Sequence, residues 1–87
     1  MLDLIFVKYN LTRTQITEYI EKRYKSEKYR NILKERILDG KGLEYIAIKY
    51  YGEYNSLNKI FLIENKISRM THKFALWLEK EMKEREK

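Results

Sequence analysis

Amide and cationic side chains recur at helical spacing between residues 58 and 69. Asparagine can form paired hydrogen bonds with adenine, whereas lysine and arginine read guanine or clamp phosphates. Steps of three and four residues place these side chains on one side of a helix, away from an apolar seam of Ile60, Ile63 and Ile67. The side chains predicted to contact DNA from this helix are Asn58, Lys59, Leu62, Asn65, Lys66 and Arg69.

Two of the side chains in this region are apolar. Phe61 and Leu62 either meet the methyl groups of thymine or contact another part of the protein, and the sequence leaves both interpretations open.

A second basic group surrounds the predicted turn between two earlier helices. These side chains are predicted to contact phosphates, which would set the register on DNA but not the sequence preference. They are Lys22, Arg23, Lys25, Lys28 and Arg30. The alternative is an ordinary basic face in contact with solvent.

The formal net charge of the 87-residue chain is +6, and the excess lies in two segments. Residues 8–36 hold nine basic and four acidic residues. Residues 56–75 hold four basic residues and one acidic residue. This charge attracts phosphate-bearing or otherwise acidic partners without specifying which.

Residue types that carry catalysis or bind metals are scarce. His72 is the only histidine, cysteine is absent, and no cluster of carboxylates has the spacing of an oxygen-ligand site. No glycine-rich loop could cradle a phosphate. We therefore expect no enzyme, metal, cofactor or small-molecule substrate. The missing cysteines, the absence of a signal peptide pattern and the lack of a long apolar run favour a cytoplasmic protein without membrane contact.

The chain contains no proline and three glycines, so long helices are expected. The prediction is an all-α fold of four to five helices in one domain, residues 1–87. Residues 1–9 fit a short helix or an extended lead-in. A capping box of Thr12 and Gln15 begins a helix over about 13–25, and Ser26 begins the next, which ends at Gly40.

A helix-turn-helix core is predicted over about residues 43–67. A turn at residues 39–42 precedes a short helix in which Ile46 and Ala47 face inward, and the small Ala47 permits a close helix crossing. After a second break, Ser56 caps a helix that has no breaker before the chain end. The alternative is a plain helical hairpin within a small bundle.

The far part of the long C-terminal helix continues the apolar seam. Its side chains either pack back on the N-terminal helix or form a homodimer interface of Phe74, Trp77, Leu78 and Met82. Residues 79–87 alternate in charge and predict a solvated helix end.

Residues 29–78 resemble the region-4 helix-turn-helix of sigma factors, in the small form found in phage transcription regulators of the ArpU and RinA kind. The resemblance is carried by YRNILKERILDGKGLEYIA and a serine-capped helix with isoleucine four residues on. The turn after Ala47 is longer than in the family, which has glycine or asparagine in the place of Tyr51. The resemblance implies a phage or mobile-element origin.

The sequence thus predicts a helix-turn-helix regulator of transcription that binds specific double-stranded DNA as a homodimer, with RNA polymerase as a further candidate partner. The alternative is a small helical factor that binds a host or viral protein through Phe61, Leu62, Trp77 and the basic face. In a phage-encoded protein, the expected location is the host cytoplasm.

Overall fold

The protein folds into helices alone in the part that the structure describes, which confirms the predicted all-α class. The structure is a computed structural model that describes residues 2–52 and 57–85, with the main chain alone at 57 and 58. The helices are α1 (Leu2–Lys8), α2 (Arg13–Arg23), α3 (Glu27–Leu33), the π-helical segment η1 (Lys34–Leu38), α4 (Leu43–Tyr51) and α5 (Leu57–Arg85).

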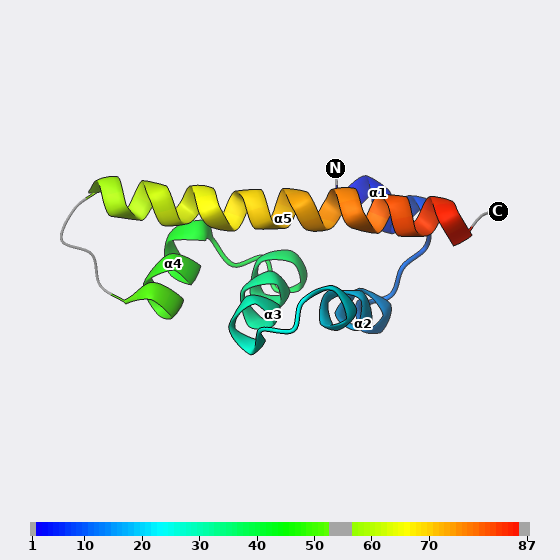
Figure 1. Ribbon diagram of the computed structural model, residues 1–87, viewed down its shortest axis with the longest axis horizontal. Helices are drawn as coiled ribbons and strands as arrows, with labels where there is room; N and C mark the ends of the chain where they lie inside the picture. Colours follow the sequence, from blue (N-terminus) through cyan, green and yellow to red (C-terminus); the bar gives the residue numbers. More distant parts are fainter. Residues whose placement is uncertain (1, 53–56, 86–87) are drawn as a thin grey trace.

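The 29-residue α5 is the axis of the molecule. Helices α4, α3 and α2 follow one another along one side of it, and α1 lies beside its C-terminal part (Figure 1). The chain is elongated, with extents of 50 × 20 × 20 Å, because α5 alone is roughly 43 Å long at 1.5 Å per residue. None of the described helices has the combination of length and apolar character that crossing a bilayer requires.

The predicted helix starts are confirmed where the structure describes them. The Thr12 hydroxyl accepts a hydrogen bond from the Gln15 amide at 3.2 Å, and the Gln15 side chain accepts one from the Thr12 amide at 2.8 Å. Such an N-cap contributes about 1 kcal/mol. The Ser26 hydroxyl caps α3 in the same way. The N-cap predicted at Ser56 lies outside the described residues.

Helix α2 ends two residues earlier than predicted, because Tyr24 has extended dihedral angles. Helix α3 continues into η1, a widened turn that the residue pattern does not predict. Arg13 of α2 donates to the Leu38 carbonyl at 3.0 Å and to the Asp39 carboxylate, so it holds the end of this turn. The predicted left-handed stop is confirmed, since Gly40 has a φ of +67°.

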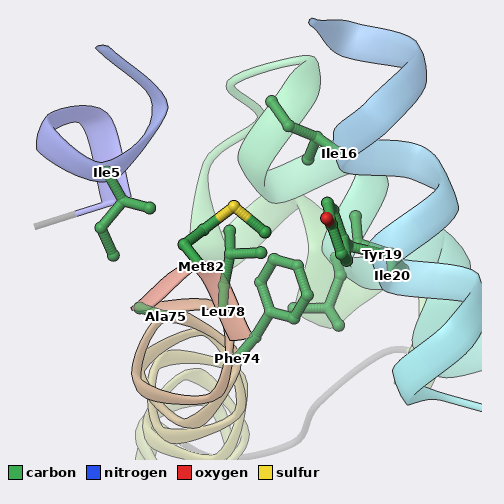
Figure 2. Packing of buried hydrophobic residues seen from close by; sticks show 9 residues of the cluster. Ile5, Ile16, Tyr19, Ile20, Phe74, Ala75, Leu78 and Met82 are labelled. Atoms are coloured by element: carbon green, nitrogen blue, oxygen red, sulfur yellow. The ribbon is translucent and has the colours of Figure 1, made fainter. Parts of the chain in front are cut away.

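The first of two apolar clusters joins α1, α2 and the C-terminal half of α5. In Figure 2, Ile5, Ile16, Tyr19 and Ile20 surround side chains of α5. Phe74 and Leu78 are fully buried, and Met82 is 5% exposed. Trp77 is half-buried, with its ring stacked on Phe74 at 5.9 Å and edge-on to Tyr19 at 6.1 Å.

This cluster decides between the two interpretations of the C-terminal seam. Packing back on the N-terminal helices is confirmed. The assignment of Phe74, Leu78 and Met82 to a homodimer interface is wrong, because a single chain already buries them. Trp77 is only half-buried, so its place in such an interface stays a prediction.

The second cluster joins α3, α4 and α5. Ile32, Ile46, Ala47 and Ile67 are all fully buried. The inward positions predicted for Ile46 and Ala47 are therefore confirmed, and three helices share one core at the predicted helix-turn-helix. Met70 packs against both clusters, so the apolar interior is continuous along α5.

Candidate nucleic-acid interface

A basic stripe runs along the side of α5 that the core leaves uncovered. Its members alternate in steps of three and four residues, which keeps them on one helical face, and all are exposed. We define the basic stripe as Lys59, Leu62, Lys66, Arg69 and Lys73.

Most of the predicted contacts on α5 are thus accessible. Lys59, Leu62, Lys66 and Arg69 belong to the basic stripe, and Asn65 is exposed next to it. The side chain of Asn58 lies outside the described residues. The side of α5 on which the prediction depends is therefore open to solvent wherever its side chains are described.

Next to the stripe, α5 and the α2–α3 turn enclose a groove of about 490 Å³. Tyr24, at the end of α2, and Tyr29, in the first turn of α3, form one wall, and α5 forms the other. The Tyr24 hydroxyl donates to the Met70 carbonyl at 3.4 Å, which fixes the turn against α5. We call this space the basic groove. Its cationic lining consists of Arg23, Lys66, Arg69 and Lys73.

No carboxylate lines the basic groove among the residues that the structure describes. The ion pairs within the described ranges lie elsewhere on the molecule: Arg13–Asp39, Lys22–Glu81, Lys34–Glu21, Lys49–Glu35 and Lys83–Glu79. The carboxylates of these five ion pairs therefore do not neutralise the groove. The positive charge of its four cations is available to an anion.

Tyr51 at the end of α4 connects the turn and the stripe. The Lys28 ammonium lies 3.9 Å from the centre of the Tyr51 ring, and that of Lys66 lies 5.5 Å from it. Each such cation–π contact contributes about 0.5–1 kcal/mol at an exposed site. A hydrogen bond with Tyr29, followed by the nearness of Tyr51, raises the pKa of Lys66 above its usual value. A lysine of ordinary or raised pKa carries its positive charge at neutral pH.

The predicted phosphate contacts on the turn have different surroundings. Lys22 is paired with Glu81 at 3.4 Å, and Arg23 lines the basic groove. Lys25 is exposed on the linker between α2 and α3, and Lys28 is exposed in the first turn of α3.

Arg30 is half-buried, and its guanidinium donates to the main-chain carbonyls of Tyr24 and Glu21. Through Nε and Nη2, Arg30 therefore holds the C-terminal end of α2. Its assignment as a phosphate contact stays a prediction.

Four groove residues were absent from the predicted contacts, namely Tyr24, Tyr29, Met70 and Lys73. Lys73 could have been found from the sequence, since it follows Lys66 by seven residues and so repeats its helical position. Tyr24 and Tyr29 could not, because their proximity to α5 depends on how the α2–α3 turn folds back.

Metal-binding chemistry finds no support in the described ranges, which contain no group of three or more histidine, aspartate or glutamate side chains placed to hold an ion.

Comparison of the chain with protein families, with curated proteins and with solved structures gives no match. The resemblance to the sigma region-4 helix-turn-helix therefore stays a prediction from the residues themselves.

Proposed function

We propose that the protein is a sequence-specific, double-stranded DNA-binding regulator of transcription. The observation that carries this proposal is the basic stripe on the uncovered side of α5. Its cations Lys59, Lys66, Arg69 and Lys73 take part in none of the ion pairs of the described residues. Sequence-independent binding to DNA is driven by lysine and arginine that displace counterions from phosphates.

The helix that carries the stripe has suitable dimensions. An α-helix with its side chains is about 10–12 Å wide, and the major groove of B-DNA is about 12 Å wide. The N-terminal half of α5 enters the major groove in this proposal. There Asn65 has the amide chemistry to pair with adenine, and Leu62 has the apolar surface to meet thymine methyls. Lys25 and Lys28 bind phosphates from the adjoining turn.

The buried three-helix core supports the same arrangement. The buried side chains of Ile46, Ala47 and Ile67 hold α4 against α5. The helix that carries the exposed basic stripe is therefore supported on its opposite side by a packed core. Rigid support of this kind positions a recognition helix.

The narrower parts of the proposal rest on the sequence resemblance. The sigma region-4 pattern is the basis for proposing control of transcription and contact with RNA polymerase. It is also the basis for proposing a phage or mobile-element origin and a location in the host cytoplasm. A homodimer stays open as an assembly state, but its interface is not the buried seam around Phe74.

A gel shift tests the proposal directly. The purified chain is titrated against duplex fragments of the genome that encodes it, at several salt concentrations. We expect a preferred fragment, and affinity for it should fall steeply with salt through counterion release. Absence of duplex binding at low salt would refute the proposal.

Substitutions then separate base reading from phosphate contact. Asn65→Ala should weaken binding to the preferred duplex more than to random duplex, by about 1–3 kcal/mol for a paired contact. His72→Ala is the matched control, because His72 is exposed on α5 outside both the stripe and the basic groove. Equal losses on both duplexes would leave binding without sequence reading.

A protein-interaction factor is the second candidate, and one observation favours it. Phe61 is 61% exposed and Leu62 is 68% exposed, so the start of α5 presents adjacent apolar side chains. Trp77, predicted as part of that contact surface, is instead half-buried against Phe74 and Tyr19. Binding of a protein partner that persists at high salt and is lost in the Phe61→Ala variant would favour this candidate over DNA binding.

A further inference from the structure

The two sides of the basic groove differ in chemistry. Arg23, Lys66, Arg69 and Lys73 supply positive charge, whereas Tyr24 and Tyr29 supply aromatic rings beside them. A DNA backbone that passes along α5 needs the cations but makes no use of the aromatic wall. The lining therefore fits a ligand that joins an anionic group to a flat, apolar body.

The groove also has the size of a small-ligand site. Its volume of about 490 Å³ lies within the range of about 300–1,000 Å³ that is usual for ligand pockets. A single nucleotide occupies such a space, and a duplex does not.

The aromatic wall is held in place before any ligand arrives. The Tyr24 ring lies 6.2 Å from the Phe74 ring in the first core cluster, and its hydroxyl is bonded to the Met70 carbonyl. Tyr29 packs against the second cluster. Because Tyr24 and Tyr29 are both held by the core, their side chains lose little conformational freedom when a ligand binds.

We propose that the basic groove binds a nucleoside phosphate, with the base against Tyr24 and Tyr29 and the phosphates against Arg23, Arg69 and Lys73. Lys66 lies beside Tyr29 at the junction of the two halves. Stacking on an aromatic ring together with charge neutralisation recognises a nucleotide without reading its base edges.

Binding in the groove has a regulatory consequence that rests on the proposed function. Lys66 and Arg69 belong both to the basic stripe and to the groove lining. A nucleoside phosphate in the groove therefore competes with duplex DNA for the same cations.

Calorimetric titration of the full chain tests the site itself. The probes are ADP, adenosine and inorganic pyrophosphate at one fixed ionic strength. ADP should bind at least about tenfold more tightly than either adenosine or pyrophosphate, because only ADP engages both halves of the groove. Pyrophosphate binding as tight as that of ADP would overturn the proposal and indicate a general anion patch.

Charge variants locate the site. Lys73→Gln and Arg23→Gln should each weaken ADP binding about fivefold or more, whereas Lys80→Gln should change it less than about twofold. Lys80 is the matched control, an exposed lysine on α5 that lies seven residues after Lys73 and outside the groove. Equal losses in Lys73→Gln and Lys80→Gln would overturn the assignment.

An aromatic variant and a polymer probe complete the test. Tyr29→Leu keeps apolar volume and should reduce the advantage of ADP over pyrophosphate, with circular dichroism confirming that the fold is retained. A short oligothymidylate should bind no more tightly than ADP per site. If it binds strongly where ADP does not, the groove is a single-strand site and the proposal fails.

Adding duplex DNA distinguishes this inference from the proposed function. Displacement of a bound duplex by ADP supports both. Binding of ADP without any duplex binding supports the nucleotide site in the groove and refutes DNA recognition. Binding of duplex without any ADP binding supports DNA recognition and refutes the nucleotide site.

Discussion

The guanidinium of Arg30, in α3, donates hydrogen bonds to the main-chain carbonyl of Tyr24, the residue that ends α2, and at 2.9 Å to that of Glu21. The last carbonyls of a helix have no partner within the helix, and a basic side chain that binds them also meets the negative end of the helix dipole. Arg30 thus fixes the α2–α3 turn that forms one side of the basic groove.

Replacing Arg30 should therefore lower stability more than DNA affinity. We expect Arg30→Met to reduce the free energy of unfolding by about 1–3 kcal/mol, because carbonyls at a half-buried helix end lose charged donors. Urea denaturation measures this change. Lys25→Met, on the exposed linker of the same turn, is the control and should stay within about 0.5 kcal/mol of the parent.

The opposite pattern would favour the predicted contact between Arg30 and phosphate. A variant with unchanged unfolding free energy but weaker duplex binding would show that its guanidinium contacts phosphate.

Phe74 should contribute to the stability of the single chain. Phe74→Ala removes a fully buried ring from the first core cluster, which costs about 3–5 kcal/mol of unfolding free energy. Leu76→Ala, two residues on, is the matched control, since Leu76 is 51% exposed and its loss should cost less than about 0.5 kcal/mol. A stable Phe74→Ala chain whose light-scattering mass is halved would instead place Phe74 between copies.

The helices were predictable because their signals are local. The capping box at Thr12, the serine cap at Ser26 and the glycine at position 40 each act within one turn of chain. The widened turn η1 was not predictable, since part of what holds it is Arg13, which lies 25 residues from Leu38 in sequence. Local patterns carry no information about such a partner.

The candidate site, too, was predictable only where its signals are local. The exposed face of α5 follows from helical periodicity, so Lys59, Asn65 and Arg69 were correctly expected to be accessible. Which cations stay unpaired depends on tertiary contacts. The sequence alone could not show that Arg30 turns inward, or that the chain folds Tyr24 and Tyr29 against α5 to form a groove.

Acid should remove the contribution of Glu35 to stability. Burial by itself would raise the pKa of Glu35, but hydrogen bonds from Lys49, at 2.6 Å, and from Tyr50 outweigh it and hold the pKa below its usual value. A carboxylate with a depressed pKa in the folded state stabilises the fold above its unfolded pKa of about 4.3, and this stabilisation is lost as pH falls through the folded value.

Thermal unfolding of the parent and of Glu35→Gln between about pH 3 and pH 7 checks this expectation. The parent should melt at a higher temperature than the variant near neutral pH, and the difference should shrink below about pH 4.3. Taking the difference removes the effect of Glu79, whose pKa is also lowered, chiefly by its hydrogen bond with Lys83. A difference that does not change with pH would contradict the role given to the ionised carboxylate.

Salt dependence should reveal how many cations of the groove reach phosphates. For duplex binding, the logarithm of affinity falls linearly with the logarithm of salt concentration, and each phosphate contact contributes about 0.9 to the slope. Lys73→Gln should therefore reduce the slope by about one, equally for preferred and random duplexes, because an ammonium on phosphate reads no sequence. Lys80→Gln should leave the slope nearly unchanged. Equal slopes for the parent and Lys73→Gln would mean that the duplex does not extend along α5 as far as Lys73, and would confine DNA contact on this face to the residues before it.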